Sequence, residues 1–381
     1  MTATLAAREI SQHTYNNDSS ALLAAWHEAT LDKKMRVRDA AEFLGVSECE
    51  LVATLVGTTA TRLAPHVSGD WVPLISRIGA LGRVMALTRN YAVVHERKGV
   101  YLNVTGSPMM GMALGDDIDL RLFLNQWQHA YAVAEPDGEN TKRSIQFFDA
   151  YGEAVHKVFL QPESSVDEFE LLTEQFKALT QTAGEVVYAN NTAPTVVKPD
   201  SDIDVPAFHQ AWAQLKDTHE FFGLLKKFSL ARTQALRLAE PRFAYRVATR
   251  SARAMLELAA HHQVAIMCFV ANAGCIQIHT GPVKNIQVMG PWLNVLDADF
   301  NLHLREDHIA QVWVVKKPTT EGIVTSLEIF DAKGFQLAQF FGKRKPGIPE
   351  LQSWRDVIAL LPSEDKQPSP KVDNLAVAAA T

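Results

Sequence analysis

The chain repeats part of itself at a nearly constant spacing, and no other feature of the sequence constrains its fold as strongly. Ser144–Gly152 reads SIQFFDAYG, and Ser326–Gly334 reads SLEIFDAKG, 182 residues further along the chain. The same offset places Asp119–Leu122 on Asn301–Leu304. Because these matches occur in the same order in both parts, we interpret the chain as a tandem repeat of one structural unit.

Hydrophobic patterning predicts the same order of elements in each copy, with helices first and strands after them. In the first copy, apolar residues at helical spacing predict helices over residues 20–29, 38–44, 48–56 and 166–179. The strands predicted in that copy cover residues 84–87, 92–95, 100–104, 118–124, 130–134, 144–148 and 153–160, with a hairpin turn at 149–152. Successive strands joined by short turns form antiparallel sheets rather than βαβ units. We therefore predict an α+β fold in which each half is a mainly antiparallel β-sheet with helices packed on it.

Length and local composition place the boundaries of the two halves. A chain of 381 residues holds two or three domains at roughly 150 residues each. A polar, proline-containing stretch after the first copy marks a linker, and the terminal SEDKQPSPK segment has the composition of a disordered tail. We predict a first repeat at 1–182, a linker at 183–204, a second repeat at 205–362 and a disordered tail at 363–381.

Composition and charge exclude several classes of protein. The chain is 47% hydrophobic and 21% charged, carries a net charge of −6, and contains three cysteines without a CxxC pair. Its longest apolar runs are much shorter than the ~20 residues that span a bilayer, and residues 1–20 lack a signal-peptide pattern. We therefore expect a cytoplasmic protein that does not insert into membranes and has no general affinity for nucleic acid.

The common catalytic motifs are missing from the sequence, and a DNA-binding motif is only suggested. No HExxH, GxSxG, P-loop or GxGxxG pattern occurs. Residues 38–52, RDAAEFLGVSECELV, resemble a helix-turn-helix, but Glu48 and Glu50 on the second helix would repel a phosphate backbone. A DNA-binding regulator that uses residues 38–52 is kept as an alternative hypothesis.

Arg121 is a charged residue within an apolar predicted strand. Alternation puts Arg121 on the strand face of Asp119 and Phe123, opposite a row of aliphatic residues. Exposure to solvent or an ion pair with Asp119 is the ordinary explanation for an arginine in this setting.

A second polar position lies at the start of the second copy. His219 is surrounded by aromatic residues in the segment DTHEFF, on a helix predicted at 215–227. Ser229 is a predicted N-cap for the next helix, so Arg232 would lie in the first turn, where a cation opposes the helix dipole. An arginine in this unfavourable position indicates an anionic partner. The residues alone thus predict a duplicated α+β protein with a binding site for an acidic, apolar ligand.

Several longer stretches of the chain resemble the HemS/ChuS family of cytoplasmic haem-utilisation proteins, also called haemin-degrading factors. The matching stretches include TRNYAVVHE (88–96), DIDLRLFLNQW (117–127), DTHEFFGLLK (217–226) and VVKKPTTEGIVTSLEIFD (314–331). The resemblance covers roughly residues 30–362 and both copies of the repeat. It implies a tandem repeat of antiparallel sheets with packed helices, and one haem bound in a cleft between a sheet and the helices of the second half.

The resemblance also implies axial roles for two residues. The family's proximal iron ligand corresponds to His219, so this residue is the expected metal ligand. The family's distal arginine corresponds to Arg121, which would act through hydrogen bonds and would be the catalytic residue if the haem is degraded. Phe221 and Phe222 follow the proximal ligand and are expected to contact the porphyrin.

Three further cations are implied at the haem propionates. Residues that the family uses there correspond to Arg232, Lys317 and Arg344. Phe341 stands where the family has a tyrosine, which removes one hydroxyl from the cofactor-binding residues. Glu220 replaces the family's usual glutamine and puts a carboxylate beside the proximal ligand.

The resemblance implies a cytoplasmic protein of bacterial haem uptake and iron acquisition that holds one haem b (iron protoporphyrin IX) between its two halves and transfers or degrades it. A haem oxygenase that uses an external electron donor is the alternative. The expected partners are haem, a haem ABC transporter, a separate haem oxygenase or an electron-donating reductase. The counterpart of Arg121 in the second copy is His303, but DTHEFF has no good counterpart that faces the first copy, so a single site is expected.

Overall fold

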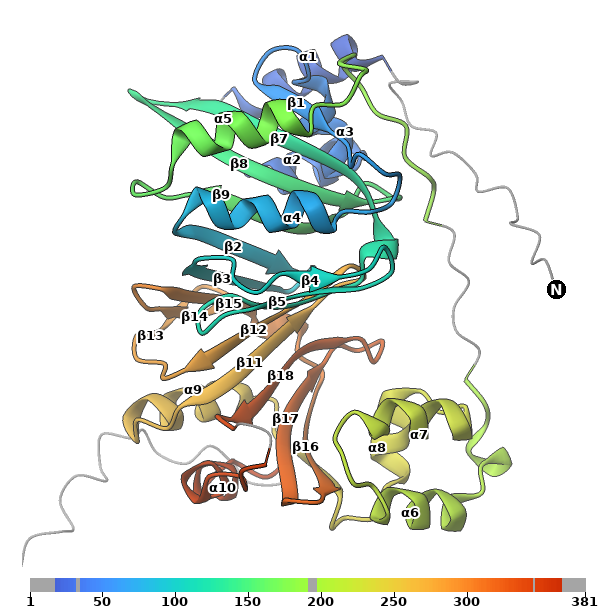
Figure 1. Ribbon diagram of the computed structural model, residues 1–381. Helices are drawn as coiled ribbons and strands as arrows, with labels where there is room; N and C mark the ends of the chain where they lie inside the picture. The colour runs from blue at the N-terminus through green and yellow to red at the C-terminus, as the bar shows by residue number, and fades with distance from the viewer. Residues whose placement is uncertain (1–17, 32–34, 191–196, 345–346, 365–381) are drawn as a thin grey trace, which may run out of the picture. The chain divides into compact units, whose positions relative to one another are not determined.

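The strands of the protein form two antiparallel sheets of nine strands each, with helices packed on them (Figure 1). The structure is a computed structural model that describes residues 18–31, 35–190, 197–344 and 347–364. The predicted α+β class, with mainly antiparallel sheets, is therefore confirmed. In these described ranges, no helix is long and apolar enough to cross a bilayer.

The duplication is visible in the order of the strands. The first repeat contributes β1 (Ala60–Leu63), β2 (Val84–Arg89), β3 (Val93–Gly99), β4 (Thr105–Gly106), β5 (Gly111–Leu114), β6 (Asp119–Leu122), β7 (Trp127–Asp137), β8 (Asn140–Asp149) and β9 (Ala154–Leu160). The second repeat contributes β10 (Ala244–Val247), β11 (Ile266–Ala271), β12 (Cys275–Gly281), β13 (Ile286–Met289), β14 (Trp292–Leu296), β15 (Phe300–Arg305), β16 (Gln311–Thr319), β17 (Gly322–Phe330) and β18 (Gln336–Gly342). The order β1-β7-β8-β9-β2-β3 recurs as β10-β16-β17-β18-β11-β12, which confirms the internal repeat.

The helices also occur at matching places in the two repeats. The first repeat carries α1 (Ser19–Thr30), α2 (Val37–Leu44), α3 (Glu48–Thr54), α4 (Val72–Ile78) and α5 (Val166–Gln175). The second carries α6 (Val205–Ala213), α7 (Glu220–Phe228), α8 (Arg232–Leu238), α9 (Ser251–His261) and α10 (Gln352–Ala359). The seven-residue helices α3 and α8 each precede the first strand of their repeat, so they are structural counterparts.

The chain divides into two compact units that do not coincide with the two repeats. Unit 1 comprises Met1–Thr195, Phe269–His279 and Ala298–Leu302, and unit 2 comprises Val196–Cys268, Thr280–Asp297 and His303–Thr381. Unit 1 thus contains segments from both repeats: Cys275–Ile278 of β12 pairs with Asp119–Leu122 of β6 in antiparallel register. The boundaries predicted from the repeat stay a prediction, because the compact units group residues by their contacts and not by repeat.

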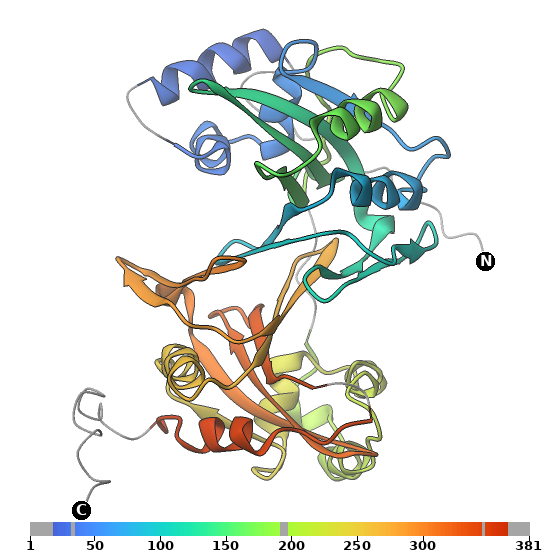
Figure 2. The same ribbon diagram turned by 60° about the vertical axis from the view of Figure 1, so that its left-hand side comes forward.

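Helices cover both faces of the main sheet in unit 1. Figures 1 and 2 show α4 and α5 along one face of β7, β8, β9 and β2, and α1, α2 and α3 on the opposite side. Trp71 and Leu172 pack with Phe147 of β8 in the core beneath α4 and α5. Tyr131 and Phe148 point the other way and pack under α3. Alternate residues of the same strands therefore face two separate apolar layers.

The α2–α3 pair has the shape of a helix-turn-helix but not its exposed recognition surface. Gly45 ends α2 with a positive φ of 67°, and Ser47 and Glu50 form a capping box at the start of α3. Every residue of Glu48–Thr54 is buried, and the carboxylate of Glu48 pairs with Arg89 and Lys157. Because α3 has no free face to insert into a groove, the structure counts against the DNA-binding hypothesis for residues 38–52.

In unit 2, the helices α6, α7 and α8 pack together on one face of strands β16 and β17 (Figure 1). Trp212 of α6 and Phe221 of α7 pack with Trp313 and Val315 of β16. Helices α9 and α10 lie on the other side of these strands in Figure 1, where the indole N–H of Trp354 donates to the carbonyl of Thr325 (3.0 Å). The sheet of the second repeat is therefore also covered on both faces.

In the first copy, one predicted strand does not form and one predicted helix ends early, whereas one predicted turn is confirmed. No strand forms at 100–104, because Asn103 has a φ of 49° that interrupts extended backbone. The helix predicted at 166–179 ends at Gln175. The turn at 149–152 joins β8 to β9, with Gly152 at a φ of 79°. A Cβ atom on this glycine would clash with Ser47 Oγ, so the turn packs closely against the start of α3.

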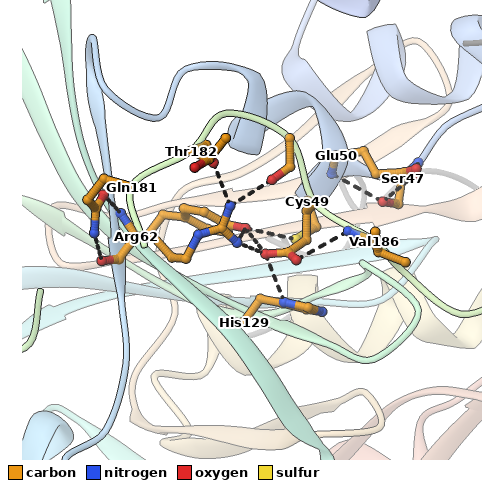
Figure 3. A network of polar contacts seen from close by, with 11 residues as sticks. Ser47, Cys49, Glu50, Arg62, His129, Gln181, Thr182 and Val186 are labelled. Atoms are coloured by element: carbon orange, nitrogen blue, oxygen red, sulfur yellow. Dashed lines mark hydrogen bonds and ion pairs between the residues drawn. The ribbon is translucent and has the colours of Figure 1, made fainter. Parts of the chain in front are cut away.

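The first part of the predicted linker is anchored to unit 1 (Figure 3). The side chain of Gln181 accepts from the backbone N–H of Arg62 and donates to its carbonyl, both at 2.9 Å. The guanidinium of Arg62 donates to the carbonyls of Gly184 (2.6 Å) and Thr182 (3.0 Å) and pairs with Glu185. Part of the segment predicted to link the repeats is therefore fixed by specific contacts. Residues 191–196 of the linker, and the predicted tail from residue 365 onward, lie outside the described residues.

Burial and the neighbouring polar groups have opposite effects on the pKa of the Glu185 carboxyl in this network. Burial alone would raise the pKa of Glu185, but hydrogen bonds from His129 and Tyr131 and the charge of Arg62 lower it to about 2. The Tyr131 hydroxyl donates to Glu185 Oε2 at 2.6 Å. The carboxylate is therefore held in its charged form as the centre of this anchor.

Candidate functional site

The predicted proximal ligand lies at the start of α7. His219 is the N-cap residue of this helix, and its side chain is 95% exposed. Helix α7 begins at Glu220 rather than at residue 215, because the residues before it form a closed turn. The backbone N–H of His219 donates to Asp217 Oδ1 (2.7 Å), and the backbone N–H of Lys216 donates to Glu220 Oε2 (2.8 Å). The two carboxylates thus fix the loop that presents the imidazole.

Asp217 also determines which ring nitrogen of His219 is available. Its Oδ1 atom lies 2.6 Å from His219 Nδ1, so the neutral ring donates its Nδ1 hydrogen to the carboxylate. Nε2 is then the basic nitrogen, on a side chain that is almost fully exposed. The hydrogen bond from the His219 backbone is the main cause of the lowered pKa of Asp217, so the carboxylate stays charged. This arrangement is suited to binding a metal through Nε2.

Arg232 is the first residue of α8, as expected, but its helix is not capped by Ser229. Ser229 has a φ of 53° and ends α7, whereas Ala231 precedes α8 without a side-chain cap. The prediction of a Ser229 N-cap is therefore wrong. The anionic partner predicted for Arg232 exists within the chain, because its guanidinium binds Glu328 in a bidentate pair at 2.7 and 2.8 Å.

Glu328 is the centre of a buried polar cluster on β17. Its side chain is fully buried and also accepts hydrogen bonds from Lys317 (3.2 Å), Ser326 (3.0 Å), Gln336 (3.2 Å) and Gln339 (2.8 Å). Burial would raise the pKa of Glu328, but the charges of Arg232 and Lys317 outweigh it and lower the pKa to about 2. Burial lowers the pKa of Lys317 to about 8 against the attraction of Glu328. With both cations charged, the cluster carries one net positive charge.

The register of the sheet puts several predicted site residues on one face. Lys317 pairs with Val324, Glu328 pairs with Gln339, and Ser326 pairs with Phe341. Directly paired residues share a face, and alternate residues of a strand do too. Lys317, Glu328 and Phe341 therefore lie on the same face of β16, β17 and β18, which is the face that α6, α7 and α8 cover.

Arg344 follows the last strand of this sheet and acts on the His219 loop. Its positive charge contributes to the low pKa of Asp217 and of Glu321, so the guanidinium lies close enough to influence both carboxylates. Its Nε atom is buried and has no hydrogen-bond partner among the described residues. A buried donor without a partner is costly, and it is the kind of group that an anionic ligand satisfies.

The two phenylalanines after His219 have different surroundings. Phe222 is 74% exposed, which leaves it available to contact a ligand. Phe221 is 1% exposed and belongs to the core, where Arg232 and Lys317 lie 5.2 and 4.7 Å from its ring centroid. Phe221 is therefore a core residue whose ring packs against the two cations and does not face solvent.

Arg121, the predicted distal residue, belongs to β6 in unit 1. Its guanidinium pairs with Asp119, which confirms the ordinary explanation for this arginine, and its side chain is 37% exposed. Arg121 pairs directly with Met112 of β5 and Ile276 of β12, so the three side chains form a row on one face. The row places one cation between apolar neighbours, and Met112 is 40% exposed. This surface is suited to one face of a flat apolar ligand.

The structure thus groups most of the predicted site residues within one unit. The members in unit 2 are His219, Phe222, Arg232, Lys317, Phe341 and Arg344, and Arg121 is the member in unit 1. Sequence reasoning missed the roles of Asp217, Glu328 and Met112. A signal existed for two of them: Asp217 stands two residues before His219 in a turn-forming position, and Glu328 interrupts an apolar strand. Nothing local in the sequence indicates that Met112 pairs with Arg121.

Known proteins resemble this chain over almost its whole length. The model of the haemin-degrading HemS.ChuX domain matches residues 45–176 and 229–361, one match in each repeat. The hemin transport protein HemS of Yersinia enterocolitica is 40% identical over 329 residues, which cover 86% of this chain and 93% of HemS. The hemin transport protein HmuS of Yersinia pestis is 39% identical over the same shares of the two chains.

Solved structures give the same result. Holo-PhuS, described as a heme-binding protein from Pseudomonas aeruginosa, is 47% identical, with a TM-score of 0.87 over 91% of this chain and 99% of PhuS. ChuS of Escherichia coli O157:H7, described as a heme degrading enzyme, is 34% identical, with a TM-score of 0.82 over 90% of this chain and 99% of ChuS. With a family match in each repeat and relatives similar over nearly their full length, the chain belongs to the HemS/ChuS family.

Proposed function

We propose that this protein binds one haem b during bacterial haem uptake, with His219 as the proximal iron ligand. The observation that carries the proposal is the exposed imidazole of His219, whose Nδ1 is engaged by Asp217 while Nε2 is left for a metal. Relatives at 39–47% identity are described as hemin transport or heme-binding proteins. The expected compartment is the cytoplasm.

The residues around His219 fit the two faces of a haem and its acidic edge. Phe222 supplies exposed apolar surface beside the ligand. The buried Nε of Arg344 has no partner among the residues that the structure describes, and a propionate would satisfy it. Arg232 is 25% exposed and can donate to a propionate while it keeps its pair with Glu328. Lys317 is only 3% exposed, so in this proposal it contributes its charge rather than a direct contact.

The proposed distal group is Arg121. Bound haem would supply the iron chemistry, and an arginine cannot compete with His219 as an iron ligand because it stays protonated. Its remaining N–H groups can donate to small ligands on the distal side, between the apolar side chains of Met112 and Ile276. One haem would then take its proximal ligand from the second repeat and its distal donor from the first, held between the two halves.

Two fates of the bound haem follow from the relatives. Transfer is the first candidate, because HemS and HmuS are described as hemin transport proteins; it would involve a haem ABC transporter as donor and a haem oxygenase as acceptor. Degradation is the second candidate, because ChuS is described as a heme degrading enzyme and as a heme oxygenase. Degradation by this chain would require an external electron-donating reductase.

The proposal is tested by titrating the ligand-free protein with hemin and recording its visible spectrum. We expect one haem per chain, and we expect His219→Ala to shift the spectrum and to accelerate haem loss. His209→Ala is the control, because His209 Nε2 is engaged by the carbonyl of Leu238 (2.6 Å). A normal spectrum for His219→Ala together with a changed spectrum for His209→Ala would refute the assignment.

A second measurement separates the two fates. The haem-loaded protein is given an electron donor and oxygen in the presence of catalase, which removes free peroxide that would bleach haem nonspecifically. Loss of the Soret band with formation of a tetrapyrrole product would establish degradation. A stable Soret band, followed by loss of haem to an added haem oxygenase, would establish transfer.

A further inference from the structure

We propose that Asp217 is a positioning residue that sets the electron-donating strength of the His219 imidazole and thereby favours ferric over ferrous haem. The inference rests on the proposed ligation of iron by His219 and deepens it. It assigns to this loop a control over the oxidation state of the bound cofactor, and it has a consequence for the choice between transfer and degradation.

The geometry fixes both partners of the hydrogen bond. One oxygen of Asp217, Oδ1, receives the backbone N–H of His219 at 2.7 Å and the ring Nδ1 at 2.6 Å. The carboxylate therefore bonds the main chain and the ring of the same residue. Because His219 is the N-cap residue directly before α7, the backbone on its C-terminal side is held by the helix. The carboxylate and the ring consequently keep a defined orientation although both are exposed.

A charged acceptor at Nδ1 changes the donor at Nε2. Outer-shell carboxylates that accept the second N–H of a metal-bound histidine orient the ring and raise its basicity. A more basic imidazole donates more electron density, which stabilises the higher charge of ferric iron relative to ferrous iron. Asp217 is expected to act in this direction, whereas a neutral acceptor would hold the ring in place with weaker donation.

Asp217 and Glu220 are both acidic and both within two residues of His219, but only one contacts the ring. Glu220 accepts the backbone N–H of Lys216 at 2.8 Å, so its carboxylate closes the loop instead. A substitution of either residue by its amide removes one negative charge next to the ligand and can keep a hydrogen bond. Asp217→Asn and Glu220→Gln therefore form a matched pair that separates the hydrogen bond to the ring from the general effect of a nearby charge.

An imidazole that is hydrogen-bonded to a carboxylate is expected to bias the bound haem toward its ferric state. A ligand that favours the ferric state resists reduction by weak donors, and reduction is required before oxygen can be activated. Haem held in this way is suited to storage and transfer, and its degradation requires a strongly reducing partner. Removal of the charge from Asp217 is expected to make the bound haem easier to reduce.

The experiment measures the reduction potential of the haem-loaded full chain and the iron–histidine stretching frequency of its ferrous form by resonance Raman spectroscopy. Wild type, Asp217→Asn, Glu220→Gln and His219→Ala are compared, each with its urea unfolding midpoint as a check on folding. For Asp217→Asn we expect a lower stretching frequency and a roughly tenfold greater preference for ferrous haem, in the range of outer-shell effects. A tenfold change corresponds to about 59 mV for a one-electron couple. Glu220→Gln should leave both quantities close to wild type.

The possible outcomes distinguish this inference from the proposed function. Equal shifts in Asp217→Asn and Glu220→Gln, or no shift in either, would overturn the role of Asp217 while His219 remains the ligand. A His219→Ala protein that keeps the wild-type stretching band would instead remove the proposed ligation itself. If Asp217→Asn fails to fold, Asp217→Glu provides the test: it retains the charge but moves the carboxylate, so an unchanged frequency would also overturn the inference.

Discussion

Replacement of Glu328 by glutamine would remove the carboxylate that pairs with Arg232 and Lys317. The oxygens of Glu328 accept the bidentate pair from Arg232, and its side chain is fully buried. Glutamine has almost the same size, and the first repeat already accommodates Gln146 at the equivalent strand position, where it is also buried. We therefore expect the substitution to change the electrostatics of the cluster with little change in packing.

The expected loss of stability follows from the pKa of the carboxyl. The pKa of Glu328 falls from a reference value of 4.5 to about 2. At about 1.4 kcal/mol per unit, this corresponds to roughly 3 kcal/mol of unfolding free energy. Removal of one partner of a buried ion pair costs about 3–5 kcal/mol by independent estimates. Both routes predict that Glu328→Gln unfolds with a free energy about 3 kcal/mol below that of wild type at neutral pH.

The pH dependence gives this prediction a definite sign. A depressed acidic pKa contributes stability that is fully present above the unfolded value near 4.5 and is lost as the pH falls toward 2. Lys317 acts in another window, because its folded pKa of about 8 lies below its reference value of 10.5. The unfolded chain binds more protons at this lysine between pH 8 and 10.5, so its contribution to stability rises with pH there.

Urea unfolding, followed by tryptophan fluorescence between pH 3 and pH 8, measures the effect. Glu306→Gln is the matched control, because Glu306 forms a bidentate pair with Arg253 in which both side chains are partly exposed. An exposed pair contributes at most about 1 kcal/mol. A Glu328→Gln protein that lies within 1 kcal/mol of wild type at pH 7, or that loses no more than Glu306→Gln, would refute the reasoning.

Two further substitutions test the distal role of Arg121 and the packing of the turn at Gly152. Arg121→Ala in the haem-loaded protein should leave ligation by His219 intact but lower the affinity for azide roughly tenfold, because a charged hydrogen-bond donor is lost; unchanged azide binding would contradict a distal role. Gly152→Ala should destabilise the protein by about 1–3 kcal/mol more than Gly138→Ala, measured by urea unfolding. Both glycines have positive φ, but the added Cβ at 152 would clash with Ser47 Oγ whereas the one at 138 meets nothing within 4 Å. Equal losses would show that the contact with α3 is unimportant.

The sequence by itself determined the architecture to a large extent. The 182-residue offset predicted two similar halves, and the structure gives both halves the same strand order. Alternation of apolar residues and the glycine at 152 located the strands and the hairpin because these signals depend on local backbone geometry. Local signals failed at two places. Asn103 has a positive φ that interrupts the extended backbone, and hydrogen bonds to Asp217 and Glu220 close a turn before α7.

Only the tertiary structure decided what the charged residues do. Arg232 and Glu328 are 96 residues apart, and they meet because α8 packs on the face of β17 from which Glu328 points. The starts of the two corresponding helices carry opposite charges: Glu48 at the start of α3 pairs with Lys157 of β9, whereas Arg232 at the start of α8 pairs with Glu328 of β17. Neither the composition nor the repeat spacing indicates which residue pairs with each of these charges. The buried partner of each charge is fixed by packing between elements far apart in sequence, and so it could not be read from the sequence alone.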